Sequence, residues 1–271
     1  MKASHHDSVR MSPKLHRMVR ADDTHVWEAG DYVVEDFVAS MPERYRQEFG
    51  STTARQHARI AAARGRRPIH ADIFVGTNAS EPGFCVVAPD VPGLLAIISA
   101  GLMLEGFDIT RADAYNRRTS SGYYEAIDLF WVRRSSGDCS APLGDADIFA
   151  VRSTLRDLLS NGDLRQRLRP ALSGTFPVAS ETRVRFRDLR GVPWLTLELE
   201  SADRPGLLAL VAAALAAEGV QIVDSRIRTY GSRVHDYFNV IELDGSRIKG
   251  TRLQRIELAV LAAIDGSMTG A

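Results

Sequence analysis

Two segments of this chain share one pattern of hydrophobic and polar positions. Residues 88–114 read APDVPGLLAIISAGLMLEGFDITRADA, and residues 201–227 read SADRPGLLALVAAALAAEGVQIVDSRI. In both, an acidic residue and a Pro-Gly pair precede small apolar residues at helical spacing, and a glycine then separates this helix from a β-branched run typical of a strand. The pattern predicts a strand, a helix and a second strand, and it predicts them twice.

The correspondence continues beyond these segments at a nearly constant spacing, so the chain contains an internal duplication. Corresponding residues lie 113 positions apart at first and 108 positions apart further on, as in Asp90 and Asp203, Glu105 and Glu218, and Asp128 and Asp236. A hairpin loop of different length in the two copies explains the change of spacing, because loops tolerate insertions.

Each copy reads as strand, helix, strand, strand and helix. In the first copy we expect strands at 83–88, 107–117 and 123–133 and helices at 92–105 and 145–160. In the second copy we expect strands at 193–200, 220–230 and 233–243 and helices at 205–217 and 251–264. With the segment 182–189 as the last strand of the first copy, this order is the βαββαβ unit of ferredoxin-like folds. The predicted fold is α+β, with two such modules in tandem at residues 80–190 and 191–268.

The N-terminal part of the chain differs from the two copies. Residues 1–30 are polar and aperiodic, which predicts a mobile tail. Residues 31–65 place apolar side chains at helical spacing and end at a glycine, so they predict short helices within a connector at residues 31–70. This helical segment is too small to fold alone, and we expect it to pack on the two copies.

Composition excludes several functions. The chain has 34 Lys and Arg against 34 Asp and Glu, which argues against a general electrostatic affinity for nucleic acid. A solvated helix end explains the basic cluster Arg64, Arg66 and Arg67 more simply than a phosphate contact does. No run approaches the ~20 apolar residues of a membrane span, and the N-terminus lacks the apolar core of a signal peptide. We therefore expect a cytoplasmic protein without a membrane or nucleic-acid partner.

The two cysteines predict neither a disulfide framework nor a metal site. Cys85 and Cys139 are too few and too far apart for metal-ligand spacing. Cys85 lies in an apolar run, so we expect it to be a small core residue.

The repeated acidic Pro-Gly motif has the residue types that recognise a free amino acid. Proline suits the first turn of a helix, glycine lets a ligand approach the backbone, and the helix N-terminus favours a carboxylate. The preceding aspartate offers a negative charge for an ammonium group. The alternative is that the aspartates only cap the helices and the glycines only permit tight packing. The candidate binding residues are Asp90, Val91, Pro92, Gly93, Leu94, Leu95, Asp108 and Ile109 in the first copy, and Asp203, Arg204, Pro205, Gly206, Leu207, Leu208, Gln221 and Ile222 in the second.

The second copy is expected to contribute more to ligand affinity than the first. It has Arg204 beside its Pro-Gly pair and Gln221 on the next strand, where the first copy has Val91 and Asp108. An arginine can hold a carboxylate bidentately, whereas valine cannot.

Several short segments resemble those of a known family. DRPGLL at 203–208 and EGVQI at 218–222 resemble the ACT domain, a small ligand-binding regulatory module. The chain resembles in more detail the tandem ACT pair that ends the bacterial protein-PII uridylyltransferase/uridylyl-removing enzymes. The resemblance covers residues 32–265 and rests further on DLFWV at 128–132, RVRF at 183–186, TYGSRVHDYFNV at 229–240 and, in the connector, MPERYRQEF at 41–49.

This resemblance implies a sensor in nitrogen metabolism. It implies that glutamine or a related amino acid binds at the interface between modules and that the chain controls a partner, such as a PII-type signalling protein or a separate catalytic chain. The chain has no room for the catalytic domains of the family, its first motif has Val91 in place of arginine, and its first hairpin, NRRTSSGYYEA at 116–126, is longer than the second. Regulation by glutamine is therefore carried over more safely than catalysis.

No catalytic, metal or cofactor site is predicted, so we expect a non-enzyme. Asp145 and Asp147 are read as acids of a first helical turn. His235 and Asp236 are adjacent in a strand, so their side chains should point to opposite faces. The alternatives are a structural or assembly module, the stand-alone regulatory part of a split uridylyltransferase, and an enzyme remnant that uses His235 and Asp236. Bare sheet edges favour a homodimer.

Overall fold

The computed structural model describes residues 31–76, 82–136, 141–161 and 182–265, so the predicted tail at 1–30 and Cys139 lie outside the described residues. The helices are α2 (Asp31–Ser40), α3 (Glu43–Glu48), α4 (Ser51–Arg64), α5 (Leu94–Leu104), α6 (Asp145–Asn161), α8 (Leu207–Ala217) and α9 (Thr251–Ile264). The strands are β1 (His70–Val75), β2 (Pro82–Pro89), β3 (Phe107–Arg118), β4 (Tyr124–Arg134), β5 (Arg183–Arg187), β6 (Leu195–Ala202), β7 (Val220–Tyr230) and β8 (Arg233–Glu242).

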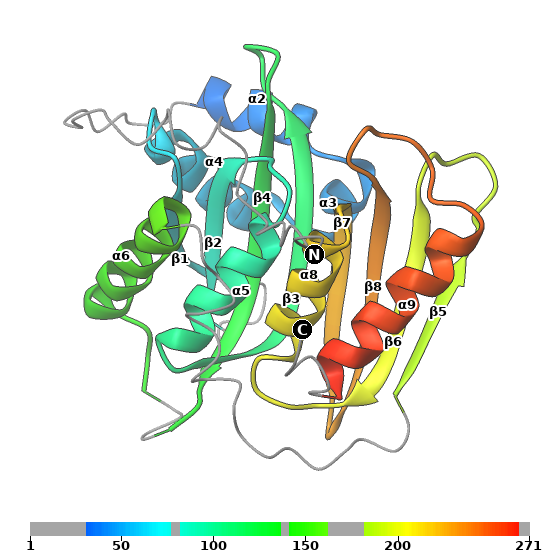
Figure 1. The fold of residues 1–271 in the computed structure, drawn as a ribbon. Coiled ribbons are helices and arrows are strands. Elements are labelled where there is room, and N and C mark those ends of the chain that lie inside the picture. Colours follow the sequence, from blue (N-terminus) through cyan, green and yellow to red (C-terminus); the bar gives the residue numbers. More distant parts are fainter. Residues whose placement is uncertain (1–30, 77–81, 137–140, 162–181, 266–271) are drawn as a thin grey trace, which may run out of the picture.

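The described strands form one antiparallel sheet of eight strands, in the order β1-β2-β4-β3-β7-β8-β6-β5 (Figure 1). The first copy comprises β1 to β4 with α5 and α6, and the second comprises β5 to β8 with α8 and α9. The predicted α+β class is confirmed, as are the helices and strands expected within each copy.

The role expected for residues 182–189 is wrong. Strand β5 does not complete the first copy but pairs with β6 of the second copy, with Val184 opposite Leu199. The outer position of the first copy is taken instead by β1, which pairs with β2 and which the sequence analysis did not predict. In each copy the outer strand therefore precedes the other three, so β5 groups with the second copy rather than with residues 80–190.

The two copies meet edge to edge at strands β3 and β7. Their register pairs Ala112 with Ile227, Asp113 with Arg226 and Ala114 with Ser225. Because equivalent positions here are 113 residues apart, Ala112 is equivalent to Ser225 and Ala114 to Ile227. The joint therefore has an internal two-fold pseudosymmetry with Asp113 and Arg226 at its centre.

Helices cover the sheet on both faces. Figure 1 shows α5, α6, α8 and α9 on one face and α2 to α4 on the other. Under the first group, apolar residues of both copies form one continuous core, with α5 packed against α8. Under the second group lies a smaller core that contains Phe37, Tyr45 and Phe74. Residues 31–65 are thus helical and docked on the sheet, as expected.

The helices α2 to α4 cover the first copy because its side chains on that face are apolar. Beneath them, Tyr115 is 1% exposed, and Ile127 and Leu129 are fully buried. Burying one such side chain stabilises a fold by roughly 1.5–3 kcal/mol. The equivalent positions of the second copy instead line an open, polar cleft of about 720 Å³, and they are Arg228, His235 and Tyr237.

The structure corrects one further expectation and bears out another. Arg64 is not at a solvated helix end but 4% exposed, and its Nε donates to Glu125 Oε1 at 2.8 Å. Cys85 is fully buried in the core, as expected. Among the described residues, no helix is both long and apolar enough to cross a membrane.

Candidate ligand-binding site

The two acidic Pro-Gly motifs fold as β-turns that end where α5 and α8 begin. In the first, the Leu94 N–H donates to the Val91 carbonyl oxygen at 3.2 Å, and Gly93 has φ 81° and ψ 3°. Gly206 has φ 77° and ψ 3° at the equivalent place. These are the angles of the third residue of a type II turn, in which proline suits the second position. The prolines therefore lie before the helices, and the expectation that they occupy the first helical turn is wrong.

Each turn leaves the N-terminus of its helix open. The first α-helical bond of α5 runs from the Ile97 N–H to the Gly93 oxygen at 3.1 Å, and that of α8 runs from Leu210 to Gly206 at 3.0 Å. The N–H groups of the two residues just before Ile97 or Leu210 have no acceptor within the helix. Because the helix dipole is positive at this end, each helix start can bind a carboxylate.

Each turn faces the opposite copy across a small cavity. The Asp90 cavity, of about 30 Å³, lies between the first motif, the start of β7 and the second half of α8. The Asp203 cavity, of about 20 Å³, lies between the second motif, the start of β3 and the second half of α5. Apart from Val223, every residue that lines the Asp90 cavity has its equivalent in the Asp203 cavity. The pseudosymmetry therefore relates two composite sites, each of which needs both copies.

Most of the candidate residues come together, but each group contains residues of both copies. The Asp90 cavity is lined by the predicted residues Asp90, Val91, Gly93, Leu94, Leu95 and Ile222. The Asp203 cavity is lined by Asp108, Ile109, Asp203, Arg204, Gly206, Leu207 and Leu208. Pro92 and Pro205 are exposed and line neither cavity. That these residues bind a ligand stays a prediction.

Arg204 and Gln221, the two residues that distinguish the second copy, lie at different cavities. Gln221 reaches across the joint to Asp90. Arg204 Nη2 donates to the carbonyl oxygen of Ile264, at the end of α9. A cation at a helix C-terminus is favourable, so Arg204 holds its turn against α9.

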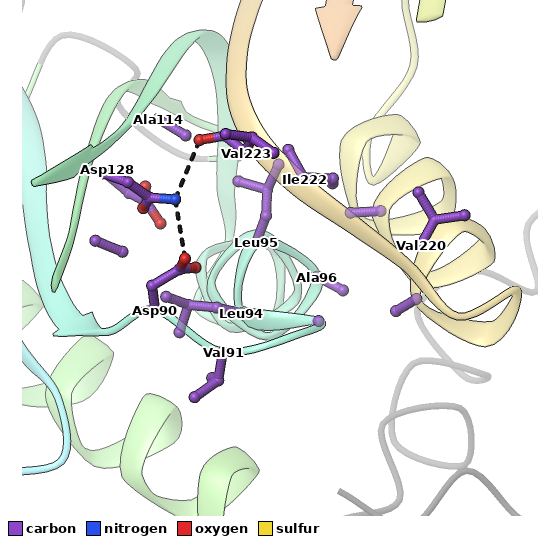
Figure 2. A pocket seen from close by; sticks show the side chains of 15 residues that line it. Asp90, Val91, Leu94, Leu95, Ala96, Ala114, Asp128, Val220, Ile222 and Val223 are labelled. Carbon is purple, nitrogen blue, oxygen red and sulfur yellow. Dashed lines mark hydrogen bonds between the residues drawn. The ribbon is translucent and has the colours of Figure 1, made fainter. Parts of the chain in front are cut away.

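Asp90 is hydrogen-bonded to two side-chain amides. Asn116 Nδ2 donates to Asp90 Oδ2 at 3.0 Å and to the Val223 carbonyl oxygen at 3.1 Å. Figure 2 draws these two bonds as dashed lines that end at Asp90 and Val223. Gln221 Nε2 lies 3.2 Å from both carboxylate oxygens. Burial raises the pKa of Asp90 to about 6, although the Gln221 bond acts in the opposite direction. No side chain caps α5, and Asp90 bonds to Asn116 and Gln221 instead, so the capping alternative is not supported in the first copy.

Asp203 has a more acidic neighbourhood than Asp90. Arg133 Nη2 lies 3.6 Å from Asp203 Oδ2, while Arg133 Nε donates to Asp108 Oδ2 at 2.8 Å. Burial, and then the charge of Asp108, raises the pKa of Asp203. The cavity therefore places two carboxylates beside one guanidinium group.

A buried aspartate forms the inner wall of each cavity. Asp128 is 3% exposed in the Asp90 cavity and Asp236 is 2% exposed in the Asp203 cavity. The Arg228 N–H donates to Asp236 Oδ1 at 3.2 Å. Burial raises the pKa of Asp236 to about 8 and also raises that of Asp128. Asp236 is therefore mostly protonated at neutral pH. These two aspartates were not predicted as site residues, although their equivalent places in the two copies were a signal that could have revealed them.

The residues of the two patterns that could suggest catalysis lie as follows. Asp236 lines the Asp203 cavity while His235 lines the cleft on the opposite face, as expected for neighbours in a strand. Asp147, in the first turn of α6, accepts a hydrogen bond from the Gly144 N–H at 2.8 Å and pairs with Arg134. Across the described residues, no group of three His, Cys, Asp or Glu is arranged to hold a metal ion.

On the face opposite the cavities, α3 is attached to both copies by polar contacts. Arg44 donates to Asp113 Oδ1 and Asp224 Oδ2, both at 3.0 Å. Glu48 accepts hydrogen bonds from Tyr115 Oη at 3.1 Å and from Arg228 Nη2 at 3.5 Å. Asp113 is fully buried at the centre of the joint.

Comparison with curated proteins places the chain beside one kind of enzyme, the bifunctional uridylyltransferase/uridylyl-removing enzymes. The relative from Phenylobacterium zucineum is 27% identical over 241 residues, which cover 86% of this chain and 25% of the relative. The relative from Xanthomonas axonopodis pv. citri is 33% identical over 187 residues, covering 66% and 20%. The relative from Rhodospirillum rubrum is 30% identical over 229 residues, covering 81% and 24%. The chain is a partial homologue of these enzymes.

The chain spans only 20% to 25% of the length of these curated relatives. No protein-family model matches it. Among solved structures, a double-ringed trimeric shell protein from the RMM microcompartment covers 71% of this chain and 86% of its own, with 11% identity and a TM-score of 0.22, a likeness too low to carry an argument.

Proposed function

We propose that this chain is an ACT-type regulatory module that senses a free amino acid, with glutamine as the first candidate. The observation that carries the proposal is the pair of composite cavities, in which an aspartate lies beside an open helix N-terminus. A free amino acid presents an ammonium and a carboxylate a few bonds apart, so it complements both groups at once. The order β1-β2-β4-β3 with helices on one face supports the ferredoxin-like ACT assignment, with the outer strand moved to the start.

The small volume of the cavities supports a sensor, because the site must change shape when it binds a ligand. About 30 Å³ and 20 Å³ give room for one or two water molecules. An amino acid can enter only if the turn of one copy moves away from the strand of the other. Binding would then change the joint between β3 and β7, which is the conformational signal that a regulator needs.

The names of the relatives support a role in the control of uridylylation. A chain that aligns with a quarter of these enzymes or less supports a regulatory rather than a catalytic part. The family resemblance of the motifs supports a PII-type signalling protein or a separate catalytic chain as the partner, in the cytoplasm. Among the described strands, β1 and β5 are outermost and each has one edge without a partner strand, which supports a homodimer.

Calorimetric titration with each of the twenty amino acids tests the proposal. We expect heat with glutamine, and a ligand present at 100 times its Kd should stabilise the chain by about 2.7 kcal/mol. The variant Asp203→Asn/Asp90→Asn should lose this stabilisation, whereas Asp244→Asn, on an exposed turn, should keep it. Absence of heat with every amino acid would overturn the proposal.

A structural or assembly module is the second candidate, and the small volume of both cavities favours it. In this alternative, the hydrogen bonds of Asn116 and Gln221 to Asp90 serve only to join the two copies. It predicts no amino-acid binding together with a stable dimer on size-exclusion chromatography.

A further inference from the structure

The two cavities differ at the positions that supply hydrogen-bond donors. Asn116 and Gln221 donate to Asp90 in the Asp90 cavity. At a spacing of 113, the equivalents in the Asp203 cavity are Thr229 and Asp108. The chain therefore contains one cavity with two amide donors and a second, nearly identical cavity without them.

In the Asp90 cavity, side chains of the protein supply the hydrogen-bond donors that the ammonium group of a ligand would supply. Three N–H···O distances of 3.0–3.2 Å join the two amides to the carboxylate, and one of the amides also bonds to the backbone of the opposite copy. A ligand entering here would have to break these bonds and leave buried amide groups unpaired, which costs about 1–3 kcal/mol for each group.

In the Asp203 cavity, the polar groups lack an equivalent donor. Thr229 Oγ1 is buried and has no hydrogen-bond partner within the described residues. Asp108, which replaces the glutamine amide, is 9% exposed and adds a second negative charge. Arg133 pairs with both Asp108 and Asp203, so these two carboxylates share one guanidinium group.

We infer that the Asp203 cavity binds the ammonium group of the amino acid, and that the Asp90 cavity is closed by Asn116 and Gln221 and binds no ligand. The ammonium N–H groups take the place that the two amides hold around Asp90. The stoichiometry is one amino acid per chain, at the second motif and the start of β3. This inference rests on the proposed function.

Exchanging one residue between the cavities tests the inference. Thr229→Asn introduces at Asp203 the amide that Asn116 provides at Asp90, and asparagine has nearly the same volume as threonine. The matched control is the reciprocal Asn116→Thr. Without any ligand, we expect Thr229→Asn to raise the midpoint of thermal unfolding by 1–3 °C and Asn116→Thr to lower it by a similar amount.

Titration with L-glutamine and with glutaramate, which is glutamine without its ammonium group, gives the second readout. For the wild type we expect one site per chain for L-glutamine and at least tenfold weaker binding of glutaramate. Thr229→Asn should weaken L-glutamine binding at least tenfold, and Asn116→Thr should leave its Kd within twofold.

The outcomes separate this inference from the proposed function. Binding of an amino acid with two sites per chain, equal binding of glutaramate, or a Kd that responds to Asn116→Thr and not to Thr229→Asn would overturn the inference while the sensor role stands. Absence of heat with every amino acid in every variant would overturn both. A folded Thr229→Asn is verified by its unfolding transition, and Thr229→Ser serves as a smaller change that should retain binding.

Discussion

Asp236 should make the stability of this protein fall as the pH rises. Its carboxyl group is 2% exposed, and burial raises its pKa to about 8, against 3.8 for an ordinary aspartate. Between these two values the folded state holds a proton that the unfolded state has released. The contribution of Asp236 to the free energy of unfolding therefore decreases with pH, by about 1.4 kcal/mol per pH unit. From pH 5 to pH 7 the loss amounts to about 2.5 kcal/mol.

Asp236→Asn removes this proton while keeping the shape of the side chain. The asparagine carbonyl oxygen can still accept the hydrogen bond that the Arg228 N–H donates at 3.2 Å. Urea unfolding of the wild type and the variant at pH 5, 6, 7 and 8 isolates the effect, because other titrating groups are common to both proteins. We expect the variant to gain about 2.5 kcal/mol over the wild type between pH 5 and pH 7. Parallel stability curves would refute the reasoning, since they would mean that Asp236 is ionised throughout.

Two other predictions concern the helices on the opposite face. His57 is fully buried with Nδ1 2.8 Å from Tyr45 Oη, and burial lowers its pKa to about 3, so near pH 6 only the unfolded state takes up a proton. As the pH falls from 6 to 4.5, His57→Phe should therefore lose about 2 kcal/mol less stability than the wild type. An equal loss for both proteins in urea titrations would contradict this prediction. Arg44→Met removes the ion pairs to Asp113 and Asp224, so it should lower the stability by roughly 1–3 kcal/mol and speed amide hydrogen exchange in α3. The control Arg46→Met, at an exposed ion pair, should change the stability by less than about 1 kcal/mol. Equal exchange rates in the two variants would show that Arg44 does not hold the helix.

The sequence predicted the parts of this fold that depend on local periodicity. The helix starting at Leu94 and the strand starting at Phe107 have an apolar pattern that a single segment contains in full. The position of β5 could not be predicted in this way. Its pattern is that of any short strand, and whether it pairs with β2 or β6 depends on contacts between segments far apart in the chain. Strand β5 is closer in sequence to β6 of the second copy, and this closeness predicts its pairing better than the βαββαβ order does.

The grouping of the site residues depended on the joint between copies and was not available from spacing. Each Pro-Gly motif was correctly placed at a helix start, but its partner strand comes from the other copy. Gln221 therefore bonds to Asp90 and Asp108 lies beside Asp203, so each motif is grouped with the strand start of the other copy. Once the antiparallel joint of β3 and β7 is known, the equivalence of residues in the two copies gives the residues that line each cavity. This includes Asp128 and Asp236.

The proposed sensor role requires a physical connection from the cavity to the rest of the chain, and hydrogen bonds of equivalent residues in the two copies link each cavity strand to α3. The backbone N–H of Arg228 bonds to Asp236 in the Asp203 cavity, while its guanidinium group reaches Glu48 and Asp113 on the opposite face. Tyr115, at the equivalent position of the first copy, donates its hydroxyl group to the same Glu48. A shift of either strand at its cavity must therefore move a side chain that is bonded to α3. Since α3 contacts both copies by these polar groups, it lies where a change in the joint can be passed to the helices that precede the sheet.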